Sequence, residues 1–358
     1  MNVWVSRGTR IGGIAAGTAV IWAVVQGFGL WVMPRVHDLD MAFSAAMNPD
    51  NYVPGVDEFF RAYTDYSNLI IALPLVSLAI AIGLYNLVRM SSDRAVRWSL
   101  ITCLLWGCVI GLLALAVGDK AKPPLVIGLG SLAPVLILIG AVPPLLLKNL
   151  NPKRWVGGVM VAEIVLLIVL WATHKLFWND GLPGANYLLL PALLVAHAGA
   201  LAAFLKMDDA RIGRFIGVFW LVLLASIITD VFVTNTIKES IARPRPLSDS
   251  YQPSNDVLRA IPEETLKGNN SYPSGHTSGT FALITPLFWW VRGRKSRTAI
   301  LSLGALQAAS RVYTVAHFLS DVLMGGLLGF GIGTLVFFLL GGPALRGPDA
   351  EPEPEQAA

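Results

Sequence analysis

The sequence has few charged residues and almost no cysteine. Asp, Glu, Lys and Arg make up 14% of its 358 residues, whereas hydrophobic residues make up 54% and the mean hydropathy is +0.61. So little charge in a chain of this length excludes a set of ordinary soluble domains. Cys103 and Cys108 stand in one apolar run, at a spacing that places them on different faces of a helix. They therefore predict neither a disulfide nor a metal site.

Positive charge is in slight excess, with a formal net charge of +4 and a pI near 9.1. The basic residues stand mostly in short segments between apolar runs, where they orient a protein in a membrane. The charge therefore predicts no nucleic acid partner. Membrane lipids are the expected surroundings, and the sequence predicts no particular oligomeric state.

Apolar runs long enough to cross a bilayer recur along nearly the whole chain. About 20 helical residues cross roughly 30 Å of hydrocarbon, and a helix satisfies its own backbone polar groups there. The sequence therefore predicts an all-α fold, a polytopic membrane helix bundle with about ten transmembrane spans. The predicted spans are residues 11–33, 69–88, 98–117, 124–147, 155–173, 187–205, 212–236, 276–291, 298–316 and 318–340.

The charges between these runs predict one orientation. The N-terminus and the segments 89–97, 148–154, 206–214 and 292–297 are basic and fall on the same side, which the positive-inside rule makes cytoplasmic. Both termini are then cytoplasmic, in a plasma or inner membrane. Residues 239–272 and the turn around His317 fall on the outer, periplasmic or extracellular, face.

Three further expectations complete the prediction. Run 11–33 is too long for the core of a signal peptide and lacks a small-residue cleavage site, so a retained span is expected. In the acidic outer stretch 34–68, residues 56–66 have the pattern of a short interfacial helix. The proline-rich acidic tail 341–358 is expected to be disordered and cytoplasmic.

Ionisable residues within or beside the last two spans are the first candidates for chemistry, because charge inside a membrane is costly. Arg311 lies about 20 Å from the inner end of its span, at ~1.5 Å per residue. His317 precedes Asp321 by one helical turn and projects from the same face. The carboxylate is expected to accept a hydrogen bond from one ring nitrogen, which leaves the other as a nucleophile or base. No nearby serine suggests itself as a partner for the histidine.

The cations indicate what such a histidine would attack. Lys238, Arg245 and Arg311 can supply charge and forked donors to the oxygens of a phosphoryl group. Ser274 and Gly275 precede a predicted helix, whose first N–H groups form an anion site. His276 follows directly and would act as the general acid for the leaving oxygen.

These residues form three blocks that resemble the signature of the type 2 phosphatidic acid phosphatase superfamily, the lipid phosphate phosphatases. The first is a lysine followed by Arg-Pro, the second is Pro-Ser-Gly-His, and the third is Ser-Arg followed by His and Asp. Every position is filled here, by Lys238, Arg245, Pro246, Pro273, Ser274, Gly275, His276, Ser310, Arg311, His317 and Asp321.

The resemblance implies a metal-independent phosphatase with no cofactor. In it His317 forms a phosphohistidine that Asp321 supports, His276 serves the leaving group and then the water, and the phosphate is held by Lys238, Arg245, Arg311, Ser274 and Gly275. It also implies a six-span core. The chain would then divide into residues 1–97 with two spans and the outer loop, a four-span insertion at 98–211, a catalytic four-span half at 212–340 and the tail 341–358. The alternative places the extra spans at the N-terminus.

Other polar residues are weaker candidates. Asp230 would pair with a neighbouring helix or act directly in the site, and Glu163 would be a buried hydrogen-bonded acid or part of a polar pathway. Arg243 would be a solvated or interfacial cation, or would touch a diphosphate or a lipid headgroup. His37, His174 and His197 have no companions at metal-ligand spacing and are read as ordinary helix or loop residues.

The sequence thus predicts an integral membrane phosphatase acting on a lipid phosphate or diphosphate. Polyprenyl diphosphate, phosphatidic acid and phosphatidylglycerol phosphate are the candidate substrates. Two alternatives stay open. One is a lipid phosphotransferase that uses the same site, and the other is a transporter or scramblase with a vestigial site.

Overall fold

The computed structural model describes residues 3–47, 55–89, 151–172, 183–246 and 270–346, and all regular structure in these segments is helical. The chain divides into two compact units. One comprises Met1–Ile71 together with Gly213–Ala358, and the other comprises Ala72–Ile212. The predicted all-α class is therefore confirmed for the described residues. The predicted spans 98–117 and 124–147 lie outside them.

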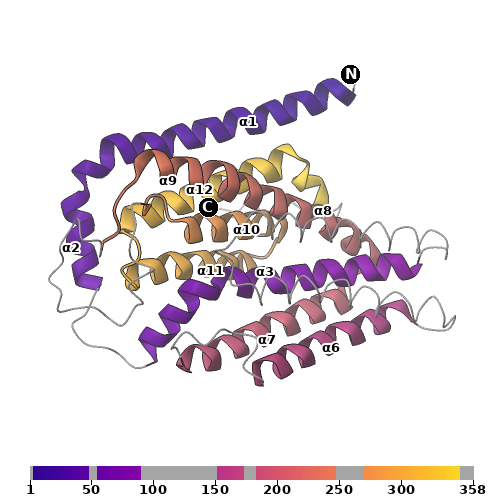
Figure 1. The fold of residues 1–358 in the computed structure, drawn as a ribbon. Coiled ribbons are helices and arrows are strands. Elements are labelled where there is room, and N and C mark those ends of the chain that lie inside the picture. Colours follow the sequence, from indigo (N-terminus) through magenta and orange to yellow (C-terminus); the bar gives the residue numbers. More distant parts are fainter. Residues whose placement is uncertain (1–2, 48–54, 90–150, 173–182, 247–269, 347–358) are drawn as a thin grey trace, which may run out of the picture. The chain divides into compact units, whose positions relative to one another are not determined.

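The first unit holds the helices that carry the three sequence blocks (Figure 1). The polypeptide runs without a break from α8 through a π-helical stretch into α9, and α11 and α12 are joined by a short turn that contains His317. The helices of this unit are α1 (Val3–Gly27), α2 (His37–Met47), the first part of α3 (Val56–Arg89), nearly all of α8 (Asp209–Ser226), α9 (Asn235–Ile241), α10 (Gly275–Trp290), α11 (Arg294–Tyr313) and α12 (Leu319–Leu339).

The centre of this unit is α12, which packs against both α10 and α1. Three glycines one turn apart, Gly325, Gly329 and Gly333, form a small-residue face that lets α10 come close. A methyl group at Gly325 would lie 2.7 Å from the carbonyl oxygen of Ser274, too close for any real contact. The start of α10 is thereby held against the first turns of α12.

Among the described residues, three helical segments are long and apolar enough to cross a membrane: Gly8–Arg35, Asp209–Ile241 and Leu319–Leu339. Shorter apolar helices cover Ile70–Asn86 and Pro191–Lys206. Large apolar side chains stand exposed on these segments, among them Val20, Phe232 and Val195, the last with 72% of its surface accessible. Exposed apolar surface of this kind suits contact with lipid.

Two local predictions differ from the structure. The expected interfacial helix 56–66 and the span 69–88 form one continuous helix, α3, because no glycine or proline occurs before Pro74 and α3 accommodates that proline. Residues Gly342–Arg346, placed in the disordered tail by the sequence, form a 3-10 helix. The Trp290 indole donates to the carbonyl of Leu345 there at 3.2 Å, so the chain stays ordered to this point.

The second unit contains α6 (Pro152–Ala172) and α7 (Pro183–Lys206), which pack side by side (Figure 1). Glu163 on α6 accepts a hydrogen bond from Ser77, and its Oε1 lies 3.9 Å from Nε2 of the buried His197 on α7. Glu163 is thus a hydrogen-bonded acid, as one of the two interpretations held. His197 lies within α7, as expected of an ordinary helix residue, and Glu163 is the acidic group beside it.

Candidate active site

Backbone hydrogen bonds tie the three sequence blocks together at one end of the first unit. The N–H of Ser274 donates to the carbonyl of Asp321 at 3.0 Å, which joins the start of α10 to the start of α12. The N–H of Ser271 donates to the carbonyl of Arg243 at 2.9 Å, which joins the segment before α10 to the segment after α9. Residues far apart in the sequence therefore meet at the ends of four helices.

The turn between α11 and α12 sets the place of His317. Val315 adopts a left-handed conformation with φ of 53°, and the N–H groups of Ala316 and His317 both donate to the carbonyl of Arg311. The chain is thus folded back on the end of α11 before α12 begins. The imidazole is 1% exposed, and Asp321 follows in the first turn of α12 with no exposed surface.

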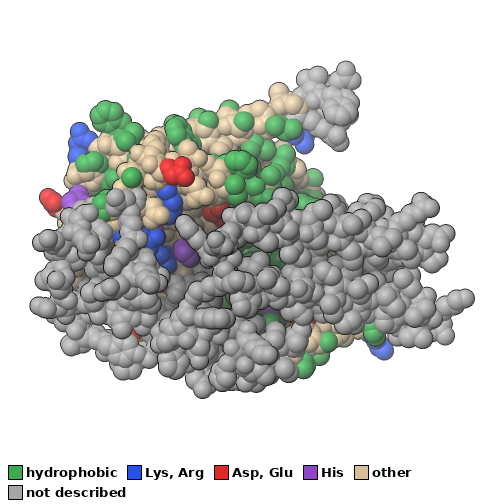
Figure 2. Space-filling model, in the orientation of Figure 1, with side chains coloured by type: hydrophobic (Ala, Val, Ile, Leu, Met, Phe, Trp, Pro, Cys, Tyr) green, Lys and Arg blue, Asp and Glu red, His purple; other side chains and the backbone are tan. Residues whose placement is uncertain are grey.

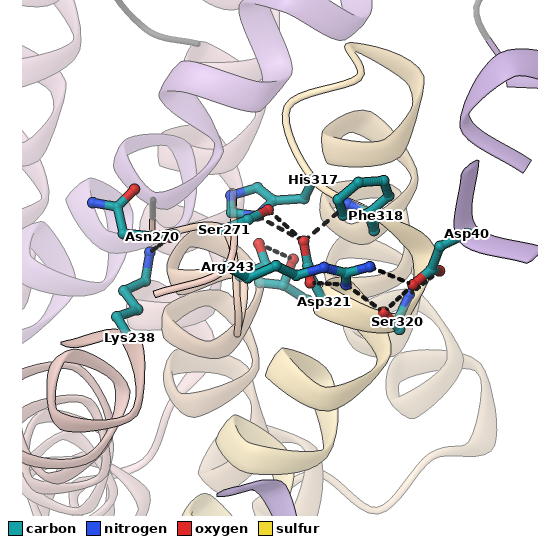
Figure 3. Close-up of polar contacts among 11 residues, drawn as sticks. Asp40, Lys238, Arg243, Asn270, Ser271, His317, Phe318, Ser320 and Asp321 are labelled. Carbon is teal, nitrogen blue, oxygen red and sulfur yellow. Dashed lines mark hydrogen bonds and ion pairs between the residues drawn. The ribbon is translucent and has the colours of Figure 1, made fainter. Parts of the chain in front are cut away.

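Nδ1 of His317 faces two oxygen atoms (Figure 3). It lies 3.6 Å from Oδ2 of Asp321 and 3.3 Å from Oγ of Ser271, and Ser271 donates its own hydroxyl to Oδ2 of Asp321 at 2.5 Å. The direct histidine–carboxylate hydrogen bond expected from the sequence is replaced by a longer contact with a serine between the two groups. The expectation that no serine accompanies the histidine is wrong.

The environment of His317 keeps its ring neutral. Burial lowers the pKa of the imidazole to about 3, although the adjacent Asp321 carboxylate opposes the shift. A neutral ring that holds its proton on Nδ1, toward Ser271 and Asp321, has its lone pair on Nε2. Nε2 is the nitrogen turned away from these two residues, so it is the atom placed to react.

Asp321 uses its two oxygens for different partners. Oδ2 faces His317 and accepts from the Ser271 hydroxyl and, at 3.0 Å, from the backbone N–H of Phe318. Oδ1 accepts from Nη1 of Arg243 at 2.6 Å. Burial disfavours the charged guanidinium, but the carboxylates of Asp321 and Asp40 outweigh it and raise the pKa of Arg243. Arg243 is buried here, so its interpretation as a solvated or interfacial cation is wrong.

The basic residues of the three blocks surround His276, which lies in the first turn of α10. Within electrostatic range of His276 are Arg311, His317, Lys238 and Arg245. Burial lowers the pKa of Arg245, and the Asp321 carboxylate opposes that shift. Figure 2 shows several basic side chains close to a histidine on this face, whereas hydrophobic side chains are spread over α1 and α8.

Individual contacts place two of these cations. Nζ of Lys238 donates to the carbonyl of Asn270 at 2.9 Å, and its side chain runs beside Gly275. Nη1 of Arg311 lies 3.5 Å from the hydroxyl of Thr64 on α3. The structure therefore gathers the predicted cations around the start of α10, and Thr64 is a neighbour that the sequence gave no reason to select.

Ser274 differs in one respect from its predicted role. Its N–H is occupied by the carbonyl of Asp321, and its hydroxyl accepts from Thr277 at 3.0 Å. The backbone N–H of Ser274 is thus not offered to an anion, although its hydroxyl proton can be. Gly275 begins α10, and the N–H groups of a first helical turn have no partner within the helix.

The remaining polar candidates lie apart from these contacts. The carboxylate of Asp230 packs on α10, where a methyl group at Gly279 would lie 2.9 Å from it. The ring of His37 packs edge-on against Phe318. His174 falls outside the described residues. Within the part of the chain that the structure describes, no group of three or more His, Cys, Asp and Glu side chains is arranged to hold a metal ion.

Comparison with known proteins identifies a domain in this region. Residues 219–341 match the PAP2 superfamily. Lipid phosphate phosphatase 2 of Arabidopsis thaliana is 29% identical over 139 residues, which cover 32% of this chain and 48% of that protein. Diacylglycerol pyrophosphate phosphatase 1 of Saccharomyces cerevisiae is 33% identical over 125 residues, which cover 28% of this chain and 43% of that protein. Phosphatidylglycerophosphatase B of Bacillus subtilis is 29% identical over 168 residues, which cover 44% of this chain and 69% of that protein.

The match spans less than half the length of the Arabidopsis and Saccharomyces relatives, 48% and 43%. No solved structure matches the chain. The resemblance predicted from the three blocks is confirmed by the PAP2 superfamily domain and by relatives that are lipid phosphate phosphatases. Together with the apolar helices, this domain identifies the chain as an integral membrane protein.

Proposed function

We propose that this chain is an integral membrane phosphatase that hydrolyses a lipid phosphate or diphosphate through a phosphohistidine intermediate. The observation that carries the proposal is the buried, neutral His317, whose Nδ1 faces Ser271 and Asp321 while cations surround the adjacent His276. A neutral imidazole held in one tautomer is a good nucleophile. Phosphoryl transfer otherwise needs mainly positioning and neutralisation of charge.

In the first step, Nε2 of His317 attacks phosphorus. A P–N bond forms as the P–O bond to the lipid breaks, and His276 gives a proton to the leaving oxygen. The ring of His317 gains positive character, which the Asp321 carboxylate stabilises directly and through Ser271. In the second step His276 takes a proton from water, the water oxygen attacks phosphorus, the P–N bond breaks and free phosphate leaves.

The phosphate is held by charge and by donors from all three blocks. Lys238, Arg245 and Arg311 supply the cations, and Gly275 with the hydroxyl of Ser274 supplies donors at the start of α10. No step requires a metal ion, so we expect the reaction to proceed in a chelator. The names of the relatives, which refer to a lipid phosphate, a diacylglycerol pyrophosphate and a phosphatidylglycerophosphate, support a lipid substrate.

We place the active site on the outer face of a plasma or inner membrane, with both termini cytoplasmic, because the charges between the apolar runs favour that orientation. There an amphiphile can present its headgroup without leaving the bilayer. About ten spans are expected. They would divide into a six-span core and the insertion 98–211, and the compact unit Ala72–Ile212 holds this insertion together with most of the span 69–88 of the core.

Phosphate release from purified lipids, measured with the protein in detergent micelles, tests the proposal. Phosphatidic acid, phosphatidylglycerol phosphate and a polyprenyl diphosphate form the panel. His317→Ala and His276→Ala should abolish release while the thermal unfolding midpoint shows that the protein is folded. Turnover retained in His317→Ala would exclude it as the nucleophile, and loss of activity in EDTA would favour a metal enzyme.

Two further arms address the other functions. A labelled donor lipid mixed with candidate acceptor lipids separates transfer from hydrolysis, because only transfer labels the acceptor. In proteoliposomes, lipid or ion flux through the His317→Ala variant would support a transporter with a vestigial site. Absence of flux, with phosphate release by the wild type, supports the phosphatase.

A further inference from the structure

Protein groups contact both terminal nitrogens of Arg243 and one face of its guanidinium. Nη1 donates to Oγ of Ser320 at 2.8 Å and to Oδ1 of Asp321 at 2.6 Å, and Nη2 donates to Oδ2 of Asp40 at 2.9 Å. The guanidinium carbon lies 3.9 Å from the ring centroid of Phe318. Both terminal nitrogens of Arg243 therefore already donate to protein oxygens.

Asp40 extends this chain of contacts to α2. Its Oδ1 accepts from the backbone N–H of Ser320 at 3.0 Å, and its Oδ2 accepts from the Ser320 hydroxyl at 2.5 Å as well as from Arg243. The carboxylate therefore lies at the N-terminus of α12, where unpaired N–H groups favour negative charge. Asp40 is 4% exposed, so this is a buried contact between α2 and the helix that carries Asp321.

The three ionised groups form one row, Asp40, Arg243 and Asp321, which Figure 3 shows from the side. Two negative charges and one positive charge leave the row with a net charge of −1. That charge lies beside the histidine that becomes positive when it is phosphorylated. Without Asp40 the row would be neutral, and without Arg243 it would hold two buried carboxylates with no cation between them.

We infer that Arg243 and Asp40 are positioning residues for the proposed phosphatase reaction, acting through Asp321. Arg243 fixes Oδ1 so that Oδ2 faces Ser271 and His317, and Asp40 keeps the row at a charge of −1 and holds α2 on the first turn of α12. The inference rests on the proposed function. It adds to the site a pair that acts through Asp321 and not on the phosphate. Arg243 stands inside the first block without being one of its matched positions, and Asp40 lies outside all three blocks.

A double-mutant cycle on the full-length protein tests the charge of the row. Arg243→Gln leaves two unpaired carboxylates, and we expect kcat to fall about 100-fold or more, because an uncompensated buried charge is costly. Asp40→Asn should lower kcat about 10-fold, since the neutral row stabilises phosphohistidine less. The double variant again carries a charge of −1, so its kcat should exceed that of Arg243→Gln about 10-fold.

Binding constants show whether a loss of kcat comes from the positioning of Asp321 or from a general disturbance of the site. Because Lys238, Arg245 and Arg311 are left intact, the KM for lipid and the inhibition constant of inorganic phosphate should stay within about 3-fold of wild type in Asp40→Asn. Asp38→Asn, at an exposed carboxylate on the same helix, is the matched control and should leave kcat unchanged. An unchanged kcat in Asp40→Asn, or a double variant whose loss is the product of the single losses, would overturn the inference.

The thermal unfolding midpoints of the same four proteins give a second readout that needs no activity. The midpoint shift of the double variant should differ from the sum of the two single shifts, even in a preparation without activity. Additive shifts would refute the buried row. If the wild type releases no phosphate from any lipid while the midpoints are coupled, the proposed function fails and the ion row stands. If the wild type is active and the cycle shows no coupling in kcat or midpoint, the row fails alone.

Discussion

Replacing Ser271 by alanine probes the contact between the proposed nucleophile and its carboxylate. The hydroxyl donates to Oδ2 of Asp321 at 2.5 Å and lies 3.3 Å from Nδ1 of His317, whereas Nδ1 and Oδ2 are 3.6 Å apart. In Ser271→Ala, Oδ2 keeps the Phe318 N–H, but the hydroxyl between the ring and the carboxylate is lost. A hydrogen bond to a charged group contributes about 1.5–3 kcal/mol. That corresponds to roughly a 10- to 150-fold loss of kcat.

The KM should change little, because Ser271 contacts the Nδ1 side of the ring and the phosphate would bind at Nε2. Rapid quenching with a phosphate-labelled lipid measures how fast label appears on the protein in a bond that acid cleaves and base does not, as expected of phosphohistidine. Ser302→Ala is the control, since the hydroxyl of this exposed serine donates to the Thr298 carbonyl of its own helix at 2.9 Å. A kcat within about 3-fold of wild type, or a loss carried wholly by KM, would refute a bridging role for Ser271.

Three further changes have defined outcomes. With a pKa of about 3 in the folded protein and ~6.5 when unfolded, His317 takes up its proton mainly in the unfolded state between these values, so stability should fall as the pH drops below about 6.5, by up to ~1.4 kcal/mol per pH unit. His317→Gln should flatten that slope in thermal unfolding. Gly325→Ala places a methyl group 2.7 Å from the Ser274 carbonyl, and we expect about 1–3 kcal/mol of destabilisation in the same measurement. Thr64→Val removes the hydroxyl beside Arg311 and should raise KM about 2- to 10-fold in steady-state assays.

Each of these outcomes can fail in a clear way. Equal pH slopes for the wild type and His317→Gln would mean that the ring is not buried and neutral in the folded protein. An unshifted midpoint in Gly325→Ala would contradict the close approach of α10 and α12. A change of kcat alone in Thr64→Val would mean that this hydroxyl does not act on phosphate binding through Arg311.

Local sequence patterns predicted the helices and the residues of the three blocks. The spacing of His317 and Asp321 places both near the start of one helix. The predicted apolar spans agree with α6, α7, α10, α11 and α12 to within a few residues at each end. Helix boundaries depend on nearby residues, so the sequence carries that information locally. The length of α3 escaped prediction because the change from polar to apolar composition at 68–69 suggested a boundary that the backbone does not need.

Partners that depend on tertiary packing were not predictable. Ser271 lies 46 positions before His317, and Asp40 lies 203 positions before Arg243 and 280 before Ser320. Nothing in the spacing of Asp40 separates it from the other acidic residues of its stretch. One signal was present for Arg243, since a second arginine two positions before Arg245 stands in a segment already assigned to the site. Its burial follows only from the fold.

The seating of α10 on α12 has a mechanical consequence. The N–H of Ser274 donates to the carbonyl of Asp321. At Gly325 the two backbones lie so close together that no side chain fits between them. We therefore expect the start of α10, proposed to bind the phosphate, to move together with α12 as one body. This would hold when the surrounding lipid changes in thickness or tension. Such changes would alter how readily a headgroup arrives at the site, while the reacting atoms keep their spacing.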